Sequence, residues 1–159
     1  QRSGESWLRF GLARPEYSDL WIGMGVFLMT VARWFLVSRD LVPQVGSTEY
    51  GSFFPLPVSP TDYVLMTLQE VTNGFAEELV MRAYLITRLS QLLRSKGSAV
   101  LFSTALFAAY HGYQGITGVA DSILFGFAMG ATFLLIRRVW PLAIGHALYN
   151  ICLDLGIGA

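Results

Sequence analysis

Hydrophobic residues along the chain fall into five long runs that are separated by polar or helix-breaking segments. The first run covers residues 20–37 and is apolar except for Thr30 and Arg33, and its length is about what the hydrocarbon core of a bilayer requires. The other four runs cover residues 61–94, 98–111, 119–136 and 142–155. This pattern predicts an all-α fold, a polytopic transmembrane bundle of about five helices.

Two of these runs raise questions of their own. Residues 61–94 would form a helix about 50 Å long, so the run is either one tilted helix or two helices that break near Asn73 and Gly74. In the first run, Arg33 lies near the end, where a long basic side chain can extend to the polar interface. We therefore expect Arg33 to snorkel toward the lipid headgroups.

The pattern divides the chain into two parts. Residues 1–60 hold an N-terminal amphipathic segment, one transmembrane helix and a Pro/Gly-rich loop, and residues 61–159 hold the remaining helices. In residues 1–16 arginines are mixed with apolar residues, which predicts either a short amphipathic turn on a membrane surface or an ordinary frayed terminus. Residues 38–60 contain too many Pro and Gly residues for a regular element, so we expect a connecting loop there.

The composition agrees with a membrane protein. Charged residues make up 14% of the chain, against about 25% in soluble domains, and the mean hydropathy is +0.50, so we expect a lipid bilayer around the helices. The formal net charge is zero, and we expect no nucleic-acid partner. The single cysteine, Cys152, excludes a disulfide framework and a multi-cysteine metal site.

The basic residues predict an orientation in the membrane. If each run crosses once, the turns on one side hold Arg94, Lys96, Arg137 and Arg138 together with the basic N-terminus. Cytoplasmic segments carry an excess of Lys and Arg, so we expect these turns in the cytoplasm. The expected localisation is that of an integral, multi-pass membrane protein, in the plasma membrane if the source is bacterial.

Three charged residues lie where a membrane helix should be apolar. Glu77, Glu78 and Arg82 occur near the middle of the 61–94 run, and each such group costs roughly 2.5–3.5 kcal/mol at the bilayer centre. Glu78 and Arg82 have i, i+4 spacing and can pair on one helix face. Glu77 is turned by about 100° from Glu78 and needs another partner. On a soluble helix such residues form a solvated face, but the apolar surroundings here favour a functional site.

Both histidines of the chain also lie in apolar helices. Phe107 and His111 share a helix face at i, i+4, and so do His146 and Asn150. A lone histidine in such a helix is more often a packing residue, but two of them, with an amide and an unpaired glutamate, favour a site. Counting the helical rise from the basic turns into the membrane places Glu77 and His111 at similar depth. His146 and Asn150 lie less deep by the same count. For the four to meet, helix tilt or a kink must close that gap.

The motifs Glu-Glu-x-x-x-Arg, Phe-x-x-x-His and His-x-x-x-Asn occur complete and in this order. Together they resemble the signature set of the CPBP family, the CAAX prenyl proteases and bacteriocin-processing enzymes, which are intramembrane endopeptidases. The resemblance covers residues 62–157, and the stretch RRVWPLAIGHALYNICLD is similar to the last motif region of that family. Family members commonly have more transmembrane helices before the first motif. We therefore expect a truncated family core, with residues 61–159 as its CPBP-like catalytic bundle.

The resemblance implies a role for each motif residue in peptide hydrolysis. Glu77 is implied as the base that activates a water molecule, and His111 as the residue that holds the same water. His146 and Asn150 are implied as donors to the oxyanion, and both side chains can donate hydrogen bonds. The implied activity is that of an intramembrane endopeptidase.

The remaining motif residues, Glu78 and Arg82, are implied to orient the site, and metal chemistry is an alternative to metal-free hydrolysis. The ligands of a catalytic zinc could come from Glu77, Glu78, His111 and His146. However, the motif His-Glu-x-x-His is absent, and no two histidines share a helix face. We therefore expect no metal and no cofactor, with Zn²⁺ as the alternative.

Two other classes of protein stay open. A non-cleaving immunity or scaffold protein of the same fold would bind a peptide or a protein partner, but it would have no need of Glu77 and both histidines. A channel or proton-coupled carrier would need a continuous polar stripe along several helices, and the runs at 20–37 and 119–136 offer few polar residues. The expected partners are a peptide or membrane-protein substrate and membrane-protein partner chains. A prenylated C-terminal tetrapeptide, a leader peptide and a membrane-protein segment all agree with the resemblance.

Overall fold

The computed structural model describes residues 4–38 and 57–155, and within these ranges it contains helices and turns but no strand. The elements are η1 (Trp7–Phe10), α1 (Tyr17–Arg33), η2 (Trp34–Ser38), α4 (Pro60–Glu77), η3 (Glu78–Ile86), α5 (Thr87–Leu92), α6 (Lys96–Tyr110), η4 (His111–Gln114), α7 (Gly115–Ile136) and α8 (Val139–Asp154). The predicted all-α bundle is confirmed, and each of the five runs forms a helix. The expected loop falls mainly on residues 39–56, which lie outside the described residues.

The run at 61–94 forms one continuous helix, so a break near Gly74 is the wrong alternative. The helix begins at Pro60, because Ser59 and Asp62 form a capping box in which each side chain accepts from the backbone N–H of the other. It passes from α4 through the π-helical η3 into α5. It ends before Arg94, whose φ of 52° is left-handed.

Gly74 has a packing role in place of a break. A Cβ atom at this position would lie 3.1 Å from the backbone nitrogen of Ala147 on α8. The absence of a side chain therefore lets α4 and α8 approach closely. This contact brings the first and the third sequence motif together.

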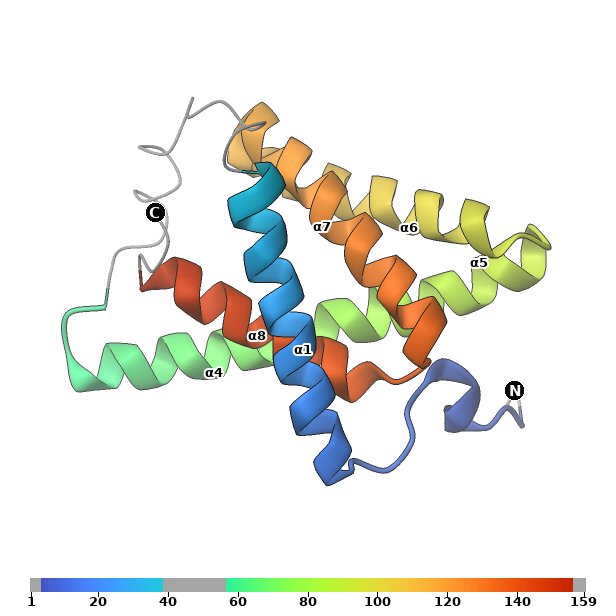
Figure 1. The fold of residues 1–159 in the computed structure, drawn as a ribbon, viewed down its shortest axis with the longest axis horizontal. Helices are drawn as coiled ribbons and strands as arrows, with labels where there is room; N and C mark the ends of the chain where they lie inside the picture. The colour runs from blue at the N-terminus through green and yellow to red at the C-terminus, as the bar shows by residue number, and fades with distance from the viewer. Residues whose placement is uncertain (1–3, 39–56, 156–159) are drawn as a thin grey trace.

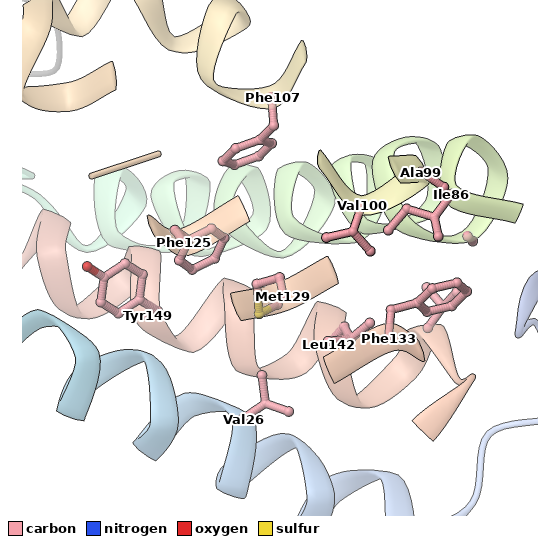
Figure 2. Close-up of a cluster of buried hydrophobic side chains, with 12 residues drawn as sticks. Val26, Ile86, Ala99, Val100, Phe107, Phe125, Met129, Phe133, Leu142 and Tyr149 are labelled. Carbon is pink, nitrogen blue, oxygen red and sulfur yellow. The ribbon is translucent and has the colours of Figure 1, made fainter. Parts of the chain in front are cut away.

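The helices are arranged around α8 (Figure 1). α8 packs against α1 and against α4, whereas α6 and α7 pack against each other as a helical hairpin that also contacts η3. Buried apolar side chains from these helices form one core, and Figure 2 shows Phe107, Phe125 and Tyr149 near one another within it. These three aromatic side chains come from α6, α7 and α8.

Much of the outer surface is apolar. Two stretches, Tyr17–Ser38 and Lys96–Ile136, are long and apolar enough to cross a membrane, and only 17% and 33% of their most apolar windows is buried inside the protein. The second stretch comprises α6, η4 and α7. Large side chains such as Trp21, Leu36 and Leu135 are exposed, as expected of surfaces that contact lipid.

The N-terminal segment is attached to the bundle, so the frayed-terminus alternative is wrong for the described residues. The backbone N–H of Val139 donates to the carbonyl of Gly11 at 3.0 Å, and Trp140 Nε1 donates to the carbonyl of Ala13 at 2.7 Å. Trp7 and Leu8 of η1 remain exposed. A position on the membrane surface stays a prediction for this segment.

The snorkelling expected of Arg33 is wrong. Its guanidinium turns into the bundle, where it donates to both carboxylate oxygens of Asp121 on α7 and, at 3.0 Å, to the hydroxyl of Tyr149 on α8. A bidentate carboxylate pair is a stronger partner for Arg than the interface. Arg33 therefore joins α1 to α7 and α8.

Candidate active site

Four of the six predicted site residues, Glu77, His111, His146 and Asn150, line one cavity of about 260 Å³, and Glu78 and Arg82 do not. Glu77 lies at the end of α4, His111 at the start of η4, and His146 and Asn150 on α8. The depth difference counted from the sequence does not separate them, because α8 packs directly against α4. Phe107, Phe125 and Tyr149, labelled in Figure 2, also line the cavity.

The backbone changes from α to π geometry between Glu77 and Glu78. A π segment has i→i+5 hydrogen bonds and occurs frequently at functional sites. Here both adjacent glutamates approach the same imidazole. His146 Nδ1 lies 2.8 Å from Glu78 Oε1, and His146 Nε2 lies 3.6 Å from Glu77 Oε2. His146 is therefore a neighbour of Glu77 on another helix, and Glu77 was expected to need a partner outside the Glu78–Arg82 pair.

The contact with Glu78 fixes one proton of His146. An ionised carboxylate only accepts hydrogen bonds, so Nδ1 donates to Glu78. Nε2 faces Glu77 at a distance longer than a hydrogen bond. Among the described residues, Glu77 Oε2 is a buried oxygen without a hydrogen-bond partner. An acceptor of this kind can take a proton from a water molecule.

Glu78 and Arg82 lie behind the cavity. Their side chains are 0% and 1% exposed, and Arg82 Nη1 lies 3.3 Å from Glu78 Oε1, so the predicted i, i+4 pairing is confirmed. The guanidinium carbon of Arg82 lies 4.3 Å from the centroid of the Phe107 ring, a cation–π contact that supports a desolvated charge. The Glu78–Arg82 pair therefore supports His146 from behind the cavity.

The Phe-x-x-x-His motif orients His111 through its own helix turn. His111 Nδ1 lies 2.8 Å from the backbone oxygen of Phe107. A carbonyl only accepts, so Nδ1 donates, and the neutral ring keeps its lone pair on Nε2. The two rings also pack together with centroids 4.3 Å apart. His111 can therefore accept a hydrogen bond from a molecule in the cavity.

The structure adds polar residues that the sequence did not single out. Asn150 Nδ2 donates to Glu70 Oε2 at 2.9 Å, which makes Glu70 a direct neighbour of a predicted site residue. Other polar residues at the cavity include Asp121, Tyr149 and Asp154. A signal for two of them exists in the sequence, because Glu70 precedes Glu77 at i, i+7 and Asp154 follows Asn150 at i, i+4.

A family model described as type II CAAX prenyl endopeptidase Rce1-like matches residues 59–152, more than half of the chain and all three motifs. The chain belongs to this family. The predicted CPBP membership is thereby confirmed, and at the level of the family the Rce1-like proteins are membrane-embedded peptidases. No curated protein and no solved structure matches the chain.

The Rce1-like match begins at α4, so α1 lies outside it. Arg33 of α1 nevertheless bonds to Asp121 and Tyr149, and both of these residues line the cavity. The N-terminal helix is therefore part of the wall that supports the site.

The possible zinc ligands named from the sequence are Glu77, Glu78, His111 and His146. Within residues 4–38 and 57–155 of this Rce1-like chain, no three or more His, Cys, Asp or Glu side chains gather as a group that could hold a metal ion. Nδ1 of His146 is engaged by Glu78 and Nδ1 of His111 by a backbone carbonyl, which leaves Nε2 as the atom of each ring that can interact with a bound molecule. As placed, these residues suit acid–base and hydrogen-bonding chemistry.

Proposed function

We propose that the protein is an intramembrane endopeptidase in which Glu77 activates a water molecule for attack on a peptide bond. The observation that carries this proposal is the buried, unpartnered Glu77 Oε2, which lies beside His146 and lines the same cavity as His111. A general base must lie within reach of the proton that it removes. Glu77 meets this requirement for a water molecule in the cavity.

In the proposed reaction, Glu77 takes one proton from the water, and Nε2 of His111 accepts the other hydrogen as a hydrogen bond and orients the oxygen. The oxygen attacks the peptide carbonyl carbon, and the carbonyl oxygen becomes an oxyanion. The proton on Glu77 then passes to the departing amine as the C–N bond breaks. The products are a carboxyl end and a free amine, and Glu77 returns to its carboxylate form.

Asn150 and His146 are the proposed donors to the oxyanion. The amide nitrogen of Asn150 carries two hydrogens, and the bond to Glu70 uses one of them. His146 has to be doubly protonated to donate from Nε2, because Nδ1 already donates to Glu78. Charge-assisted hydrogen bonds of this kind are roughly twice as strong as neutral ones.

The proposed substrate is a prenylated C-terminal peptide, since the family description names CAAX prenyl endopeptidases. A substrate with a lipid chain also suits a protein with an apolar outer surface. The proposed localisation is integral and multi-pass, in the plasma membrane if the source is bacterial. The proposed reaction uses no metal and no cofactor.

The experiment that tests this function uses protein in liposomes after exhaustive chelation. The protein is incubated with a farnesylated CAAX-type peptide and with the same peptide lacking the prenyl group, and products are identified by mass spectrometry. We expect chelated protein to release the C-terminal tripeptide from the farnesylated peptide. Binding without cleavage would support the scaffold alternative. Activity that is lost to the chelator and restored by zinc would make His111 and His146 metal ligands.

A further inference from the structure

Glu70 is a buried carboxylate in the cavity that none of the three motifs contains. It is 7% exposed, and it lies on α4 two turns before Glu77. Its Oε2 accepts from Asn150 Nδ2 at 2.9 Å, and its Oε1 accepts from Gln69 Nε2 at 3.3 Å. A buried carboxylate is costly unless it is hydrogen-bonded, so its direct bond to a predicted oxyanion donor calls for an explanation.

The packing of α4 against α8 explains why Glu70 meets Asn150. The two helices run antiparallel, with Glu77 opposite His146 and Gly74 against Ala147. One further turn along each helix, Glu70 lies opposite Asn150. The close approach at Gly74 therefore brings both pairs to one wall of the cavity. His146 and Asn150 each have a glutamate of α4 as neighbour.

Glu70 controls which atom of the Asn150 amide faces the cavity. A side-chain amide can turn over and present either its oxygen or its NH₂ group, whereas a carboxylate oxygen accepts only. Bonding to Glu70 therefore holds the NH₂ group in place, and its second hydrogen stays available to a developing oxyanion. We propose that Glu70 is a positioning residue that acts on peptide hydrolysis through Asn150, an inference that rests on the proposed function.

A kinetic double-mutant cycle tests the inference. Glu70→Met removes the acceptor at nearly constant length, Glu70→Gln retains an acceptor oxygen, and each is combined with Asn150→Ala. We expect Glu70→Met to lower kcat roughly tenfold to a hundredfold and to leave KM little changed. This fold-loss should not exceed the fold-loss caused by removing an oxyanion donor. Glu70→Gln should recover most of that loss. In the Asn150→Ala background, Glu70→Met should have no further effect.

Asp121→Asn is the matched control, because Asp121 lines the same cavity but is paired with Arg33. The effects of Asp121→Asn and Asn150→Ala on kcat should be independent, so the two fold-losses should multiply in the double variant. Turnover is counted per folded molecule, and melting temperatures are measured for every variant. The inference is overturned if the fold-losses of kcat caused by Glu70→Met and Asn150→Ala multiply in the double variant. It is also overturned if Glu70→Met lowers the melting temperature without lowering kcat. Wild-type turnover by Asn150→Ala would overturn it together with the oxyanion assignment, and absence of cleavage by the wild type would overturn the proposed function itself.

Discussion

The imidazole of His146 touches two adjacent glutamates, and the surroundings of the two carboxylates differ. Glu78 is fully buried, bonds Nδ1 and pairs with Arg82. Glu77 lines the cavity, whereas Glu78 does not, and each carboxylate has one buried oxygen without a hydrogen-bond partner among the described residues. At the residue scale, we therefore expect Glu78 to contribute to the stability of the bundle and Glu77 to the chemistry.

This difference predicts that the same type of substitution destabilises the protein at Glu78 and has little effect on stability at Glu77. Glu78→Gln leaves Arg82 buried without its carboxylate, and removing one partner of a buried ion pair costs about 3–5 kcal/mol. Glu77→Gln is the matched control, because Glu77 is not bonded to Arg82, and it should melt near the wild-type temperature. Thermal melting in detergent makes the comparison. Equal melting temperatures for the two variants would contradict the division of roles.

The donors on α8 give a kinetic prediction. If Asn150 and His146 bind the oxyanion, their interactions exist chiefly in the transition state. Asn150→Ala and His146→Ala should each lower kcat by about 10²–10³ with KM little changed. Turnover per folded molecule and thermal melting, measured together, check this. Residues with a purely structural role would lower the melting temperature and leave the turnover of the folded fraction unchanged.

The motif residues could be predicted because charged and imidazole side chains are exceptional in apolar helices. Arg33 also stands out in the sequence, but the direction in which its side chain points depends on Asp121, a partner 88 positions away. The local sequence does not show such a contact. Glu70 shares a helix face with Glu77, but this spacing alone does not show that Glu70 belongs to the site. The tertiary structure shows it by placing Asn150 against Glu70.

At the scale of elements, hydrophobic patterning located all five helices, because each run is long and bounded by turn residues. The α-to-π change at Glu78 was not predictable in the same way. It alters backbone hydrogen bonding within an unbroken helix and leaves no mark in the hydrophobic pattern. The site depends on this change, since both glutamates approach His146 there.

The attachment of the N-terminal segment predicts a pH-dependent stability. Hydrogen bonding to the Arg88 guanidinium lowers the pKa of Glu5 below its ordinary value of 4.5. A carboxyl whose pKa is lower in the folded state stabilises the fold above its unfolded pKa, and the contribution is lost as the pH falls through the folded pKa. Glu5→Gln should therefore lower the melting temperature slightly at pH 7 and not at strongly acid pH. A difference that persists in acid would contradict this role.

At the scale of the whole molecule, much of the outer surface is apolar, and the N-terminal segment makes polar contacts with the bundle. The N-terminal segment contacts α5 through Glu5 and Arg88 and the α7–α8 turn through Arg9 and Arg137. The basic turns thus lie at one end of the molecule, as their distribution in the sequence predicted. The cavity is lined by residues of α4, α6, η4, α7 and α8 and is supported by α1.

The measurement that tests the central claim most directly is the turnover of Glu77→Gln per folded molecule in liposomes. Removal of a general base costs about 10²–10⁴ in rate. We predict a loss of this size for Glu77→Gln at an unchanged melting temperature. Near-wild-type cleavage by folded Glu77→Gln protein would contradict the account.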